Sequence, residues 1–166
     1  DAGRLDEAFP DLEAILNHPG LVEHLRKEPM LLARMHGPTE SLILNLHGAS
    51  RRYCLGGKFD KGRTIARRAL EVAILLNRHR AASHYNLAKV HALAAPIEPN
   101  YIVNAAKQLY LAFLANPVYR RDYYEQDPLF DVVRAQIDAQ LDQKPDPSEH
   151  YHRRMAANSV GKDPSH

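Results

Sequence analysis

Apolar positions recur along the chain with the period of an α-helix, and the strict alternation typical of a strand is nearly absent. The pattern predicts helices near residues 5–17, 21–27, 30–36, 40–55, 59–77, 81–95, 100–115, 118–125 and 128–142. Prolines separate these stretches, at Pro19, Pro29, Pro38, Pro96, Pro99, Pro117 and Pro128. The sequence therefore predicts an all-α protein.

Local signals mark several ends of these predicted helices. Thr39 or Ser41 is a suitable N-cap for the 40–55 helix, and Gly56-Gly57 is a typical helix end. Asp127-Pro128 predicts another start, with an acidic cap followed by proline at the first helical position. Residues 143–166 are polar and contain Pro and Gly. We expect a helical domain over 1–142 and a C-terminal tail over 143–166.

One local pattern occurs twice, about a hundred residues apart. The segments 17–34 and 116–134 each contain Asn and Pro, a short helix, an acid followed by Pro, two large apolar residues and a final Arg. Each segment follows an amphipathic stretch. The recurrence predicts a repeated helix–turn–helix unit.

Within residues 46–74, Gly57 is followed two positions later by Phe59, and then by Ala66, Ala69 and Leu70. This segment resembles a tetratricopeptide repeat, a 34-residue helical hairpin. Gly62 stands where that family usually has alanine. On propensity alone, it should weaken its helix by up to about 1 kcal/mol.

Two degenerate copies extend the resemblance. One runs over Tyr85–Ala88 and on to Ala105, Leu109, Ala112 and Pro117; the other comprises Gly3, Leu5, Ala8, Leu12 and Ile15 and has no first helix. Because the chain also lacks an initiator Met, we expect a processed product or a piece of a longer protein. The resemblance implies stacked antiparallel hairpins, a tetratricopeptide-like α-solenoid whose first helices line a concave face.

The resemblance also implies which residues face a partner. The family's concave positions correspond here to His47 and Arg51 in one repeat, and to Tyr85 and Lys89 in the next. Arg51 and Lys89 hold equivalent positions, so stacking should place them side by side. Two cations with a Tyr and a His suit an acidic peptide or a C-terminal carboxylate. The alternative is a solvated basic groove without a fixed ligand.

Charge is segregated, although the net charge is only +2. Residues 51–80 contain nine Lys or Arg against two acids, whereas acids dominate 122–149. We regard five basic residues as a secondary binding surface: Lys58, Lys61, Arg63, Arg67 and Arg68. It could meet an acidic protein, the acidic end of another copy or a nucleic acid, or simply be a solvated helix face.

Other functional classes find no support in the sequence. It contains no phosphate-binding glycine loop, nucleophile elbow or paired zinc-binding histidines, and Cys54 is the single cysteine. No apolar run reaches the ~20 residues of a membrane helix. We therefore expect a non-enzymatic protein–protein interaction module, without metal or cofactor, in the cytoplasm and within a larger assembly. The alternative is an accessory domain contacting nucleic acid through residues 51–80.

Overall fold

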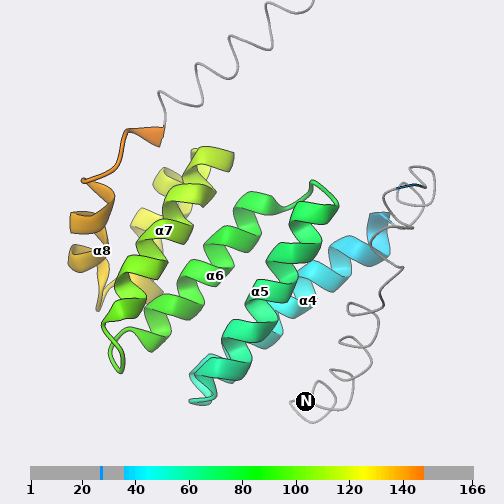
Figure 1. Cartoon of the computed structure of the whole chain (residues 1–166), viewed down its shortest axis with the longest axis horizontal. Coiled ribbons are helices and arrows are strands. Elements are labelled where there is room, and N and C mark those ends of the chain that lie inside the picture. The colour runs from blue at the N-terminus through cyan, green and yellow to red at the C-terminus, as the bar shows by residue number, and fades with distance from the viewer. Residues whose placement is uncertain (1–26, 28–35, 148–166) are drawn as a thin grey trace, which may run out of the picture. The chain divides into compact units, whose positions relative to one another are not determined.

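The computed structural model describes Lys27 and residues 36–147, and every regular element in this part of the chain is helical (Figure 1). The prediction of an all-α protein is confirmed. The α-helices are α4 (His36–Leu55), α5 (Phe59–Leu75), α6 (Arg80–Ala94), α7 (Asn100–Ala115) and α8 (Arg134–Leu141). Between α7 and α8 lie a π-helical turn η1 (Tyr119–Tyr123) and two 3-10 turns, η2 (Tyr124–Gln126) and η3 (Pro128–Phe130).

Several predictions fall outside the described residues. These are the helices predicted near 5–17 and 21–27, nearly all of the one near 30–36, the first repeat copy, and the tail beyond Pro147. The first residues of the predicted tail are described, and they contact the helical body. Lys144 Nζ lies 5.4 Å from the ring centroid of Tyr110 on α7, and Pro147 is buried. Some of the segment predicted as tail therefore packs.

The chain divides into two compact units, Asp1–His79 and Arg80–His166. In the first unit, α4 and α5 pack together as a hairpin joined by a three-residue turn. In the second, α6 packs against α7, and α7 against α8. The predicted stacking of hairpins into one solenoid over 1–142 stays a prediction.

The turn between α4 and α5 follows from its two glycines. Gly57 has a φ of +76°, in the left-handed region that favours glycine. Its N–H donates to the Cys54 carbonyl at 2.9 Å, and the Lys58 N–H donates to the Tyr53 carbonyl at 2.8 Å. These two bonds form a Schellman motif. α4 therefore ends at Leu55 as predicted, and α5 begins at Phe59 as predicted.

The predicted start of α4 was wrong. The helix already includes His36, so neither Thr39 nor Ser41 is its N-cap. Pro38 lies in the first turn of this helix instead of before it. A proline is tolerated there because the first N–H groups of a helix have no intrahelical acceptor.

A second Schellman motif ends α5 two residues earlier than predicted. Asn77 adopts a φ of 52°, and its N–H donates to the Ile74 carbonyl at 3.1 Å. The Arg78 N–H donates to the Ala73 carbonyl at 2.9 Å. Asn is among the few residues other than glycine that visit this conformation readily, so the end is encoded without a glycine signal.

Close approach of α4 and α5 explains Gly62. A Cβ atom on Gly62 would lie 2.3 Å from Cys54 Sγ and 2.7 Å from the backbone oxygen of Ser50. The glycine thus permits the helices to cross closely, whereas the sequence alone indicated only a loss of helix propensity. Around this crossing lies a core of buried residues: Leu46, Ala49, Tyr53, Ile65 and Ala69.

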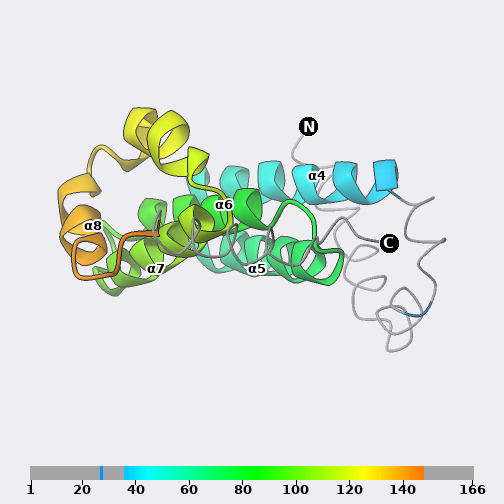
Figure 2. The same ribbon diagram turned by 90° about the horizontal axis from the view of Figure 1, so that it is seen from above.

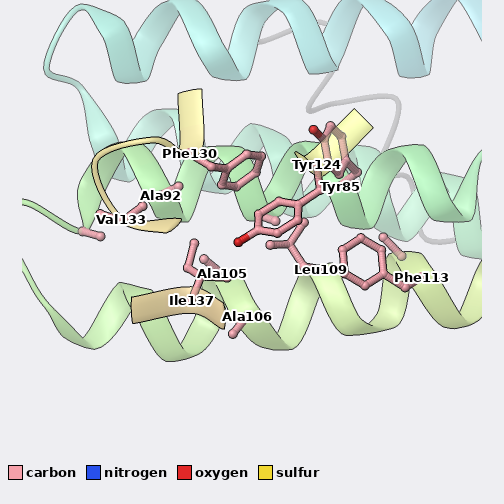
Figure 3. Close-up of a cluster of buried hydrophobic side chains, with 13 residues drawn as sticks. Tyr85, Ala92, Ala105, Ala106, Leu109, Phe113, Tyr124, Phe130, Val133 and Ile137 are labelled. Atoms are coloured by element: carbon pink, nitrogen blue, oxygen red, sulfur yellow. The ribbon is translucent and has the colours of Figure 1, made fainter. Parts of the chain in front are cut away.

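The core of the second unit is aromatic and lies between α6, α7 and the segment that follows α7. Figure 3 shows the Tyr85 ring in the middle of this cluster, near Phe130 and Leu109. The ring centroids of Tyr85 and Phe130 are 5.8 Å apart, and those of Tyr124 and Phe130 are 5.0 Å apart. Both spacings suit the tilted and edge-to-face contacts that aromatic rings prefer.

The segment after α7 differs from the two continuous helices predicted near 118–125 and 128–142. It forms the short turns η1, η2 and η3, of which η1 and η3 pack against α6, before α8 begins (Figure 2). Asp127 does cap a helical turn, but only the 3-10 turn η3 with Pro128 at its start. Burial of Tyr124 and Phe130 from these turns outweighs the regular helical period of the sequence.

Gly62→Ala should lower the free energy of unfolding by about 1–2 kcal/mol, because the steric overlap exceeds the gain in helix propensity. Gly48→Ala is the matched control within α4: no atom lies within 4 Å of a Cβ added there. That change should stabilise the protein by up to about 1 kcal/mol. Urea unfolding of both variants checks the pair. Equal effects on stability would contradict the close crossing.

Candidate interaction site

Two of the predicted binding residues, Tyr85 and Lys89, lie one turn apart on α6 and share one partner, Asp127. Lys89 Nζ lies 2.6 Å from Asp127 Oδ2, and the Tyr85 hydroxyl donates to the same oxygen at 2.8 Å. The Leu129 N–H donates to Asp127 Oδ1 at 3.1 Å. Lys89 Nζ also lies 4.9 Å from the centroid of the Tyr85 ring, within cation–π range.

Electrostatics at this cluster favour an ionised Asp127. Burial by itself would raise the pKa of its carboxyl group, but hydrogen bonds from Lys89, Tyr85 and the Leu129 N–H outweigh burial and lower that pKa. Burial, together with the hydrogen bond to Asp127, raises the pKa of Tyr85, so its hydroxyl stays a donor. The cluster is thus a charge pair with a neutral phenol beside it.

Lys89 therefore has an anionic partner within its own unit. Only 16% of the Lys89 side chain and 15% of the Asp127 side chain are exposed, and Tyr85 is buried. Arg134 Nη2 donates to the backbone oxygen of Asp127 at 2.8 Å, which fixes the same loop from α8. This arrangement indicates a structural role for Tyr85 and Lys89 in attaching η3 to α6.

The other predicted pair lies on α4 in the first unit. Arg51 is exposed, whereas His47, one turn earlier, is buried. Burial first, and then the charges of Arg51 and His79, lower the pKa of His47 to about 4. Near neutral pH His47 is a neutral core residue. The predicted adjacency of Arg51 and Lys89 stays a prediction, because the two residues belong to different units.

The five residues of the predicted basic surface differ in their surroundings. Lys58 and Lys61 lie over the Tyr53 ring, with Nζ atoms 5.8 and 4.4 Å from its centroid. Arg63 pairs with Asp60, and Arg68 with Glu71, each at 2.6 Å on the surface of α5. Arg67 is exposed, and no acid among the described residues pairs with it.

Two exposed arginines also lie near the end of α4. Arg51 and Arg52 are exposed, and neither forms an ion pair or hydrogen bond with any described residue. The hairpin surface thus carries three arginines without acids beside them: Arg51, Arg52 and Arg67. We call these three residues the open arginines. The charge excess over 51–80 predicted a basic surface here, but the sequence could not show which cations are already paired.

Sequence reasoning missed Asp127 as a partner of Tyr85 and Lys89. The Asp127-Pro128 pair signalled a cap, and the cap is present, but Lys89 and Asp127 are 38 positions apart in the chain. Within the described residues, no three His, Cys, Asp or Glu side chains gather to hold a metal ion. No helix in this part of the chain has both the length and the apolar character needed to cross a membrane.

Comparison with known proteins finds no match to this chain among protein-family models, curated proteins or solved structures. The tetratricopeptide resemblance therefore stays a prediction that depends on the residues quoted for it. The functional interpretation depends on the geometry of the two units themselves.

Replacing Lys89 tests whether this residue stabilises the fold or is a cation available for binding. Lys89→Met should lower the free energy of unfolding by about 1–3 kcal/mol, since it leaves the Asp127 carboxylate largely buried without its cation. In a double-mutant cycle with Asp127→Asn, thermal unfolding should show a favourable coupling energy. Lys107→Met is the control, because Lys107 is an exposed lysine on α7. Equal stability of the Lys89→Met and Lys107→Met variants would contradict the structural role.

The buried His47 predicts a loss of stability in mild acid. Its pKa is about 4 when folded and 6.5 when unfolded, so the unfolded state binds the proton more tightly. The contribution, about 2–4 kcal/mol, is present above pH 6.5 and is lost as the pH falls towards 4. Burial lowers the pKa of His84 too, which adds a loss of the same sign. An NMR titration of the His47 ring checks this; a midpoint near 6.5 in the folded protein would contradict it.

Proposed function

We propose that this chain is a protein–protein interaction module that binds an acidic partner through the basic surface of the α4–α5 hairpin. The observation that carries the proposal is the set of open arginines, Arg51, Arg52 and Arg67, on a well-packed pair of helices. Exposed arginines on a rigid element suit recognition of carboxylates, because the guanidinium group offers paired donors in a fixed geometry.

Exposed apolar side chains beside Arg51 favour a protein partner over a nucleic acid. Leu44 and Leu55 are exposed on α4, and both lie on the same side of the helix as Arg51. A protein partner can bury leucines while it pairs the arginine, as the centres of protein interfaces commonly do. A phosphate backbone would use the arginines but would leave the leucines in water.

The second unit contributes differently in this proposal. Lys89 and Tyr85 hold the loop at Asp127, so the proposed site moves from a groove shared by both repeats to the hairpin surface around Arg51. Tetratricopeptide-like stacking of hairpins remains part of the proposal and would place this surface within a longer helical array. The proposal assigns the chain no catalytic step.

A peptide array provides the test. We expect the protein to bind amphipathic helical peptides of about 20 residues when their polar face is acidic, and not when that face is basic. Arg51→Glu together with Arg67→Glu should weaken binding to the acidic peptides about tenfold or more, with little effect on folding. Lys107→Glu, a charge reversal on α7, should leave binding unchanged.

A second measurement distinguishes a protein partner from a nucleic-acid partner. The affinity for the best acidic peptide should fall only moderately between low and high salt, whereas affinity for a single-stranded RNA probe should fall steeply. Leu55→Ser should weaken binding to the peptide. Tighter binding to RNA than to any peptide, with no effect of Leu55→Ser, would favour the nucleic-acid alternative. Unchanged peptide affinity in the double arginine variant would contradict the proposed site.

A further inference from the structure

The outward side of α4 presents an apolar face with one arginine. It consists of Leu44, Gly48, Arg51 and Leu55, spaced four, three and four residues apart, so that all lie on one side of the helix. Leu44 is 52% exposed and Leu55 is 72% exposed. We call these four residues the α4 outer face.

Gly48 lies within this face without an internal steric reason. A glycine in a helix interior costs about 1 kcal/mol relative to alanine. Gly62 is explained by its close contact with Cys54 and Ser50, but a Cβ on Gly48 would have no atom within 4 Å. A glycine flanked by exposed leucines allows another backbone or a bulky apolar side chain to approach closely. The α4 outer face therefore leaves room at Gly48 for another chain to approach.

A second exposed face lies at the acidic end of the chain. Val132, just before α8, is 78% exposed. Ala135 and Ala139 are exposed along α8, and the exposed Asp142 follows the last residue of the helix. With spacings of four and three residues, Ala135, Ala139 and Asp142 share one side of α8, and Val132 lies just before the helix. We call Val132, Ala135, Ala139 and Asp142 the α8 outer face.

The two faces are complementary in charge, with Arg51 on one and Asp142 on the other. The described residues 36–79 contain eight Lys or Arg and three acids. Residues 122–146 contain seven acids and two basic residues, Arg134 and Lys144. Arg51 of one face can pair with Asp142 of the other, and the alanines of α8 can pack against the leucines of α4.

We infer that the acidic partner is a second copy of this chain: the α4 outer face of one copy docks on the α8 outer face of the next. This rests on the proposed function and names its partner. Because the two faces differ, the contact is head-to-tail and builds either a closed ring or an open chain of copies. Association rises with concentration, and salt weakens it by screening the charges.

Variants that each remove one face test this directly. An α4-blocked variant carries Leu44→Glu and Leu55→Glu and keeps the α8 outer face. An α8-blocked variant carries Val132→Lys and Asp142→Lys and keeps the α4 outer face. In light-scattering chromatography and sedimentation velocity, the wild type should grow in mass with concentration, and each variant alone should be a monomer. An equimolar mixture should form a dimer that grows no further, since it joins the one intact face of each kind.

Two further variants test whether the effects are specific to the two faces. Ile97→Glu replaces another large exposed apolar residue, 71% exposed and outside both faces, so association should persist. Gly48→Gln should stabilise the monomer, because it improves helix propensity, and should weaken association about tenfold or more. Circular dichroism and thermal unfolding confirm that every variant is folded.

Several outcomes would overturn the inference. These are a monomeric wild type at every concentration, self-association that survives in the α4-blocked variant, and a mixture of the blocked variants that stays monomeric. After any of these outcomes, the proposed function would still hold if acidic peptides bind the α4–α5 hairpin and this binding requires Arg51. Loss of peptide binding together with intact head-to-tail association would instead confine the module to self-assembly.

Discussion

In the second unit, the packing of the segment after α7 depends on the carboxylate of Asp127. One side chain accepts bonds from the Lys89 ammonium, the Tyr85 hydroxyl and the Leu129 N–H, and so attaches the irregular segment after α7 to α6. Arg134 binds the backbone oxygens of Asp127 and Tyr124 from α8. With these polar groups satisfied, the rings of Tyr85, Tyr124 and Phe130 can be buried together. The burial of aromatic surface then stabilises this unit.

Local pairing decides which charges face solvent unopposed. In the second unit, Lys89, Arg121 and Arg134 each have an acid within 2.7 Å. On α5, Arg63 and Arg68 are neutralised by acids three residues away. Among the described residues the open arginines have no such acid, and their hairpin also exposes Leu44 and Leu55. The functional interpretation therefore depends less on net charge, which is small, than on the distribution of ion pairs.

The two helical glycines, Gly48 and Gly62, have different structural surroundings. Gly62 lies at a close helix crossing and is required by its neighbours within the hairpin, whereas Gly48 faces open space. In a sequence both simply lower helix propensity. In the structure the first is explained by packing, and the second points outward to a surface that another molecule can approach.

The sequence alone determined the helical class and most helix ends near α4, α5, α6 and α7, because periodicity, proline and the Gly56-Gly57 signal are local. It also located the basic surface, since charge segregation is visible in one dimension. Tertiary structure alone decided the short turns after α7, the early end of α5 at Asn77 and the close crossing at Gly62. It alone also paired Lys89 with Asp127 and buried His47 and Tyr85. Each of these depends on contacts between different elements of the chain or on a backbone conformation without a unique residue signal. Those contacts decide which side chains are exposed.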